Sequence, residues 1–178
     1  MHARFSANTL AEESDRSHMQ PVSTSLKRIL MIYGGHAGGR TWAMADAVRL
    51  GVERAQEPIE LRARPALEAD IDDLLWAKAL LIGTPEHFGY MSGAVKDFMD
   101  RTFYPAGERT TGLPYALFVS ASNDGSGAVS SIERIAVGYR WNRVAEPLIV
   151  RGEVDAAAIE RCMELGETLA AGVSLGIW

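Results

Sequence analysis

The chain has 178 residues, of which 47% are hydrophobic and 23% are charged, a balance typical of one globular domain with a full core. The formal net charge of −5 argues against a broad nucleic-acid interface, which needs a basic face. No apolar run reaches the roughly 20 residues that span a bilayer. A lone cysteine, Cys162, excludes an internal disulfide and fits a reducing cytosol. We therefore expect a cytoplasmic protein without nucleic-acid or membrane partners.

Residues 1–26 are rich in Ser, Ala, Glu and Thr and show no sustained hydrophobic period. They also lack the basic start and apolar core of a secretory signal. We predict a flexible extension there, followed by a single domain over residues 27–178. Cys162 falls on the apolar face of the last predicted helix, so we expect its thiol to pack in the core.

The domain alternates short apolar runs with amphipathic segments. The predicted strands are residues 28–33, 58–62, 79–82, 114–120 and 148–150. The predicted helices lie near residues 41–52, 91–102, 129–139 and 159–170, and the first has Thr41 as its N-cap. Residues 65–73 are predicted to form a loop with a helical turn, and residues 74–76 to lead into the third strand. This alternation predicts an α/β fold, with a parallel sheet covered by helices on both faces.

A Gly-rich loop, residues 34–41, joins the first strand to the first helix. Its glycines allow close approach of backbone N–H groups to a phosphate, and Arg40 and Thr41 add a charge and a hydroxyl. The alternative is a tight turn without a ligand. The nucleotide P-loop pattern nearly matches, but Arg40 replaces its lysine and Gly83-Thr84 stands where a metal-binding Asp is expected. The glycine spacing excludes a dinucleotide G-x-G-x-x-G motif.

Two further loops follow the third and fourth strands. In the segment 83–93, Phe88 and Tyr90 are suited to stack on a planar ring, and Glu86 is suited to contact its polar edge. His87 is either a simple loop histidine or a group that faces the ring and orients a second substrate. The third loop offers Asn123 and backbone donors, although Asn-Asp-Gly is also a common turn sequence.

The segment Gly83-Thr84-Pro85-Glu86-His87-Phe88-Gly89-Tyr90-Met91-Ser92-Gly93, with Lys96, Phe98, Asp100, Arg101 and Thr102 after it, resembles flavodoxin-like proteins. Within them it is similar to WrbA-like quinone reductases and NADPH-dependent FMN reductases. The resemblance covers about residues 28–172. It implies a three-layer flavodoxin-like fold, with a five-stranded parallel sheet of order 2-1-3-4-5 and FMN at the switch between strands one and three.

The resemblance also implies cofactor-binding residues in all three loops, and neither a catalytic side chain nor a metal ligand. For the FMN phosphate these are His36, Gly38, Gly39, Arg40 and Thr41. For the isoalloxazine ring they are Thr84, Pro85, Glu86, His87, Phe88, Gly89, Tyr90, Ser120, Ala121, Asn123, Asp124 and Gly125. The family's phosphate loop usually begins with a serine, where this chain has Gly34, Gly35 or His36. We therefore expect weaker FMN binding, or a cradle in which Arg40 compensates.

The implied activity is electron transfer from NAD(P)H through FMN to a quinone or another small acceptor. Two alternatives stay open: a non-enzymatic flavodoxin electron carrier, and a flavodoxin-fold binding module without FMN. A homo-oligomer, either a dimer or a tetramer, is also expected. The apolar residues Phe103, Tyr104, Pro105 and Trp141 suit a subunit interface or, equally, a place in the core.

Overall fold

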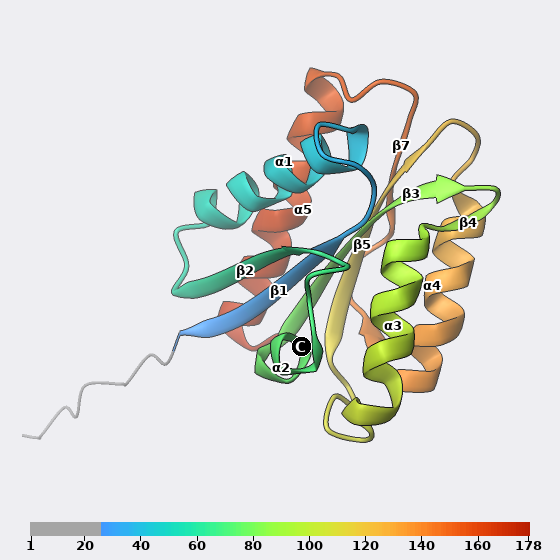
Figure 1. The fold of residues 1–178 in the computed structure, drawn as a ribbon. Helices are drawn as coiled ribbons and strands as arrows, with labels where there is room; N and C mark the ends of the chain where they lie inside the picture. The colour runs from blue at the N-terminus through green and yellow to red at the C-terminus, as the bar shows by residue number, and fades with distance from the viewer. Residues whose placement is uncertain (1–25) are drawn as a thin grey trace, which may run out of the picture.

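The computed structural model describes residues 26–178 (Figure 1). Its strands are β1 (Lys27–Tyr33), β2 (Ile59–Pro65), β3 (Ala79–His87), β4 (Tyr90–Met91), β5 (Pro114–Ala121), β6 (Asn142–Arg143) and β7 (Leu148–Arg151). Its helices are α1 (Arg40–Arg54), α2 (Ile71–Trp76), α3 (Gly93–Ala106), α4 (Ser126–Tyr139) and α5 (Ala156–Leu175). The predicted extension over residues 1–26 lies, except for Leu26, outside the described residues.

The sheet has the predicted order, with its fifth position shared by two short strands. The strands β2, β1, β3 and β5 are neighbours and run parallel. On the outer side of β5, β6 pairs with its start and β7 with its end, both in parallel. Within the described part of the chain only β4 is antiparallel, and it pairs with an extension of β3 beyond the other strands. The order 2-1-3-4-5 is therefore confirmed once β6 and β7 are counted as one interrupted strand.

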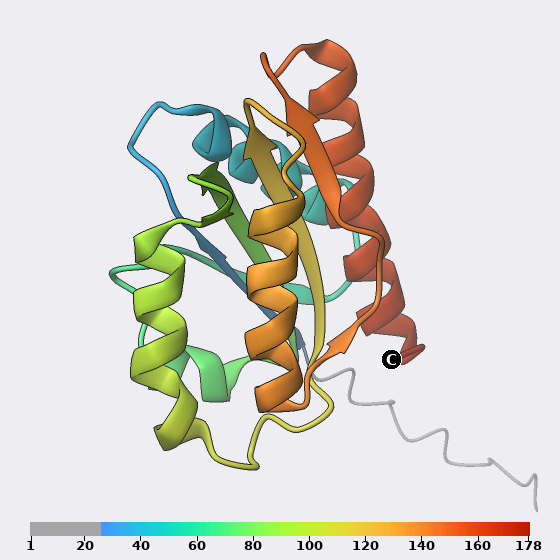
Figure 2. The same ribbon diagram turned by 90° about the vertical axis from the view of Figure 1, so that its right-hand side faces the viewer.

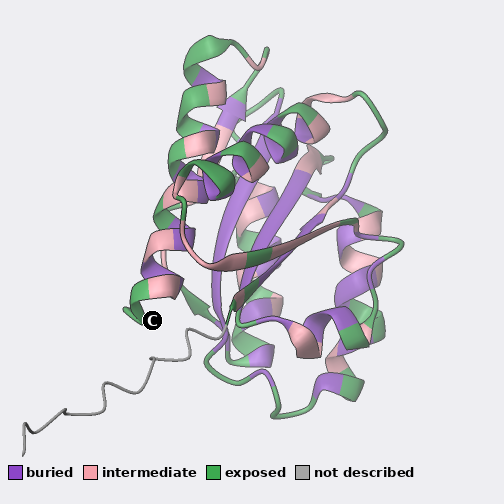
Figure 3. Cartoon of the chain, turned by 90° about the vertical axis from the view of Figure 1, so that its left-hand side faces the viewer, coloured by how far each residue is buried: buried purple, intermediate pink, exposed green. Residues whose placement is uncertain are grey.

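Helices α1 and α5 cover one face of the sheet, and α2, α3 and α4 cover the other (Figures 1 and 2). Successive residues of β1 point to opposite faces, so Leu30 and Ile32 join one apolar cluster and Ile29 and Met31 join the other. The central strands are buried over most of their length, and β5 over all of it (Figure 3). Burial on both faces explains why these strands are continuous apolar runs.

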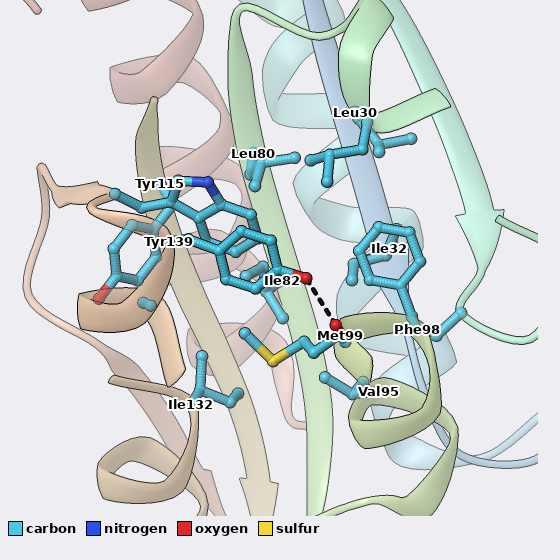
Figure 4. Close-up of a cluster of buried hydrophobic side chains, with 14 of the residues drawn as sticks. Leu30, Ile32, Leu80, Ile82, Val95, Phe98, Met99, Tyr115, Ile132 and Tyr139 are labelled. Atoms are coloured by element: carbon cyan, nitrogen blue, oxygen red, sulfur yellow. Dashed lines mark hydrogen bonds between the residues drawn. The ribbon is translucent and has the colours of Figure 1, made fainter. Parts of the chain in front are cut away.

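Cys162 lies fully buried on α5, as predicted, and burial raises the pKa of its thiol to about 11. The thiol is therefore protonated at neutral pH and packs as a small apolar group. On the other face, the hydroxyl of Tyr139 donates to the carbonyl of Met99 at 2.6 Å (Figure 4). Trp141 stacks on the Tyr139 ring with centroids 4.0 Å apart, and its Nε1–H donates to Thr110. Trp141 is thus a core residue, whereas Tyr104 is exposed.

Three local predictions were wrong, and a fourth was incomplete. The predicted helical turn and residues 74–76, which lead into β3, form one helix, α2, because Asp70 and Asp73 form a capping box that starts it. The segment 83–93 is largely a hairpin of β3 and β4. The edge strand β2 continues to Pro65. A proline is tolerated there because the strand lies at the sheet edge and the missing N–H is at the strand end. Helix α1 begins at Arg40 after Gly39, so Thr41 lies inside the first turn and does not cap it.

None of the helices within residues 26–178 is both long enough and apolar enough to cross a membrane.

Candidate functional site

The carboxyl ends of β1, β3 and β5 meet at one edge of the sheet, because Tyr33 is in register with Gly83, and Pro85 with Ser120. A cavity of about 90 Å³ opens there. Its lining residues come from all three predicted loops: Gly35, His36, Gly39, Arg40, Thr41, Pro85, His87 and Ser120. No carboxylate is among them, so the cavity is lined by hydrogen-bond donors and by one fixed positive charge.

The N-terminus of α1 at this cavity has no side-chain cap within residues 26–178. Every other helix start there has one: Asp70 caps α2, Ser92 caps α3 and Asp155 caps α5. The Glu86 carboxylate, from β3, caps α4 by accepting from the N–H groups of Gly127 and Ala128. The first-turn N–H groups of α1 are therefore left for an external acceptor, and the helix dipole favours an anion there.

Thr41 and Ser120 add a buried hydroxyl pair. Their oxygens lie 2.8 Å apart, and each side chain is almost fully buried. Two hydroxyls carry two protons, and this hydrogen bond uses one of them. The second proton has no acceptor among the described residues, so a ligand oxygen in the cavity would satisfy it.

Arg40 contacts the protein instead of pointing freely into the cavity. Its Nη1 donates to the carbonyls of Ala121, at 3.1 Å, and Gly152, at 2.6 Å. Its Nη2 donates to the hydroxyl of Ser122 at 3.1 Å. The guanidinium thus ties the start of α1 to the ends of β5 and β7, and it contributes charge to the cavity from a fixed position.

The glycines at the start of the loop explain why the family's serine is missing. A Cβ on Gly34 would lie 2.1 Å from the Ser92 hydroxyl oxygen, so a side chain there would have to displace the hydroxyl that caps α3. Gly35 has φ +92°, a conformation that disfavours every other residue. The first position of the loop with neither this clash nor a positive φ is therefore His36.

Beyond the sheet, β3 and β4 form a hairpin whose two-residue turn is Phe88-Gly89, both with positive φ. Phe88 is fully exposed at the tip. Thr84, by contrast, is buried, and its hydroxyl accepts from the Ser92 N–H at 2.9 Å. Of the residues expected at a flavin ring, Thr84 therefore supports the hairpin, and Phe88 and Tyr90 remain accessible to a ligand.

Glu86 faces α4. Its carboxylate accepts from the N–H groups of Gly125, Gly127 and Ala128 at 3.2, 3.0 and 3.3 Å. A Cβ on Gly127 would lie 2.0 Å from the Gly89 carbonyl oxygen, so the hairpin and α4 are in backbone contact. Sequence reasoning placed Glu86 at a ring edge and missed this role, because the partners lie about 40 residues away along the chain.

Hydrogen bonds to Asp124 fix the turn of the third loop. Its carboxylate accepts from the Ser126 N–H and hydroxyl at 2.9 and 2.8 Å, and these hydrogen bonds lower the pKa of the Asp124 carboxyl. Gly125 follows in the left-handed region. Asn123 and Asp124 are exposed and do not line the cavity, whereas the Ala121 carbonyl accepts from Arg40. This loop is therefore the turn that the sequence left as an alternative, and Arg40 connects it to the candidate site.

The sequence model of a family described as NADPH-dependent FMN reductase matches residues 27–147, more than half of the chain. The chain belongs to this family. A flavodoxin from Aquifex aeolicus (strain VF5) is 37% identical over 73 residues, which are 41% of this chain and 38% of that protein. The match thus spans well under half of the relative's length.

Solved structures of low sequence identity share the fold of this family member. A flavodoxin from the domain Archaea superposes with a TM-score of 0.69 at 20% identity, covering 82% of this chain and 98% of that one. A flavodoxin, WrbA-like protein from Agrobacterium tumefaciens gives 0.66 at 19% identity, with 83% and 97% covered. The flavodoxin-like fold predicted from the sequence is therefore confirmed.

Proposed function

We propose that the protein is an FMN-dependent oxidoreductase that takes electrons from NAD(P)H and delivers them to a quinone or another small acceptor. The observation that carries this proposal is the donor-lined cavity at the uncapped start of α1, in a chain of the FMN reductase family. Ligand pockets for whole cofactors usually measure about 300–1,000 Å³. A cavity of about 90 Å³ suits a phosphate group alone, with the ring outside it.

The residues present fit such a cofactor. The first-turn N–H groups of α1 and the spare hydroxyl proton of Thr41 and Ser120 would bind the phosphate. Phe88 would lie beside the ring, on a hairpin that Glu86 holds against α4. Bound there, FMN would supply the redox chemistry, so the chain would contribute binding, orientation and donors and would need no acid, base or nucleophile of its own.

The first experiment is the visible absorption spectrum of the purified full-length protein, before and after addition of FMN and desalting. We expect retained flavin bands at about 375 and 450 nm, a property of the cofactor. NAD(P)H oxidation should then accelerate when a quinone is added. Protein that retains no flavin after saturation would contradict the proposal and favour a flavodoxin-fold binding module.

A non-enzymatic electron carrier is the second candidate, favoured by the match to the Aquifex flavodoxin. Such a carrier would bind FMN equally well but would not turn over NAD(P)H without a separate reductase. Steady-state NAD(P)H oxidation by the purified protein alone, with a quinone as acceptor, distinguishes the two.

We also propose that the protein forms a homo-oligomer through α3 and α4, which lie side by side (Figure 2). A groove of about 470 Å³ runs between them from Tyr90 to Gly138. Tyr104 beside it is 87% exposed and Val137 on α4 is 75% exposed, so each copy offers both a groove and apolar side chains to fill it.

Replacing Tyr104 with Glu should therefore shift the protein toward monomer, because a carboxylate would be buried at the interface. Sedimentation velocity measures the change. Leu67→Glu, which alters an exposed apolar residue after β2, is the control and should leave the oligomeric state unchanged. A wild-type protein that sediments as a monomer would contradict the proposal.

A further inference from the structure

Two histidines from different segments of the chain, His36 and His87, line the cavity. His87 reaches it because side chains alternate along β3: Pro85 and His87 line the cavity, whereas Glu86 between them accepts from α4 on the other side. His36 comes from the loop that precedes α1. Neither imidazole has a hydrogen-bond partner among residues 26–178, so both keep their donor capacity for a ligand.

The backbone holds the His36 ring against the start of α1. The Gly39 N–H donates to the His36 carbonyl at 3.0 Å, which closes a tight turn. A Cβ placed on Gly39 would lie 3.0 Å from both Cε1 and Nε2 of His36. The imidazole therefore lies directly over Gly39, next to the uncapped N–H groups of the first turn of α1.

The guanidinium of Arg40, which also lines the cavity, is already bonded to other parts of the protein. It donates three hydrogen bonds to the loops after β5 and β7, so a phosphate in the cavity needs further donors. Gly34 and Gly35 lack the hydroxyl that the family's phosphate loop usually has at its start, and a side chain at either position would meet the Ser92 hydroxyl or an unfavourable φ. Imidazole donates a hydrogen bond in its neutral form and adds a positive charge when protonated, so it suits a phosphate ester.

We propose that His36 and His87 together bind the phosphate of the flavin and make the site select phosphorylated FMN over riboflavin. This assignment rests on the proposed function. It keeps the expectation from the family resemblance for His36, and it differs from both readings of His87 in the sequence, a simple loop histidine or a group that faces the ring and orients a second substrate. The two imidazoles replace the missing hydroxyl with this chain's own phosphate contacts.

The test compares dissociation constants for FMN and riboflavin, which differ only in the phosphate, by quenching of flavin fluorescence in the full-length protein. His36→Ala and His87→Ala should each weaken FMN binding about 10-fold or more, the loss expected for a charge-assisted hydrogen bond. Riboflavin binding should change less than about 3-fold. His87→Gln keeps a neutral donor and should fall between wild type and His87→Ala.

Both histidines are exposed, so the variants should fold, and circular dichroism of each variant checks this. Lys78→Ala removes an exposed positive charge at the opposite end of β3 and is the control for general electrostatics. The FMN-to-riboflavin ratio should stay at the wild-type value in that variant. Variants of His36 and His87 that keep the wild-type ratio would overturn the inference while leaving the proposed function intact. A wild-type protein that binds neither flavin would overturn both.

Discussion

Replacing Gly166 with Ala is expected to destabilise the protein by about 1–2 kcal/mol in net terms, although alanine is the better helix former. A Cβ at Gly166 would lie 2.1 Å from the Val48 carbonyl oxygen on α1. The same holds in reverse, because a Cβ at Gly51 of α1 would lie 1.9 Å from the Met163 carbonyl oxygen on α5. The two helices therefore pack backbone against backbone through one glycine each.

The sign of this effect follows from two magnitudes. Alanine gains about 1 kcal/mol over glycine inside a helix. Overpacking a close-packed contact costs about 1–3 kcal/mol, and more where the obstacle is backbone that cannot rotate away. The obstacle here is a main-chain carbonyl, so the packing loss should exceed the gain in helix propensity.

Urea denaturation of the wild type and the variant measures the difference. Gly93→Ala is the matched control, since Gly93 begins α3 and has nothing within 4 Å of an added Cβ. That variant should be neutral or more stable by up to about 1 kcal/mol. If Gly166→Ala were as stable as Gly93→Ala, the close approach of α1 and α5 would be wrong.

The fold could be predicted because its strands are buried on both faces. Runs such as Ile29 to Ile32 and Leu80 to Ile82 have no polar alternation, and this pattern is typical of a central parallel strand. The edge of the sheet that carries the loops then follows from topology alone. By contrast, β6 has only two residues, and its Asn142 and Arg143 are exposed, so no hydrophobic pattern marks it.

The roles of individual site residues could not be predicted in the same way. Proline and glutamate are depleted in strands, yet Glu86 and His87 continue β3 because β4 pairs with them. Whether Glu86 points to a ligand or to α4 depends on the alternation set by that pairing. Likewise, the need for glycine at position 34 comes from the Ser92 hydroxyl, which lies far along the chain and next to it only in space.

Replacing Glu86 with Ala is expected to weaken the binding of both FMN and riboflavin about 10-fold or more, and to lower the free energy of unfolding by about 1–2 kcal/mol. The carboxylate accepts three N–H groups at the start of α4, where Gly125 offers no capping side chain. Without it, those donors lose their partner and the hairpin loses its anchor. Phe88 at the tip should then become mobile.

Comparing the binding of FMN with that of riboflavin distinguishes the role of Glu86 from that of His36 and His87. Glu86 acts on the hairpin beside the ring, which FMN and riboflavin share, so both ligands should weaken by a similar factor. Variants of His36 and His87 act on the phosphate, so only FMN should weaken. Glu86→Gln keeps one carbonyl acceptor without the charge and should give an intermediate loss.

Glu153→Ala is the control, because Glu153 is an exposed carboxylate that follows β7 at the same edge of the sheet. It should leave stability and both dissociation constants unchanged. If Glu86→Ala lost stability but bound both flavins normally, the carboxylate would be a helix cap alone and the hairpin would not need it. If Glu86→Ala weakened the binding of FMN but not of riboflavin, Glu86 would act on the phosphate. That result would contradict the structure, in which the Glu86 side chain points from β3 to α4.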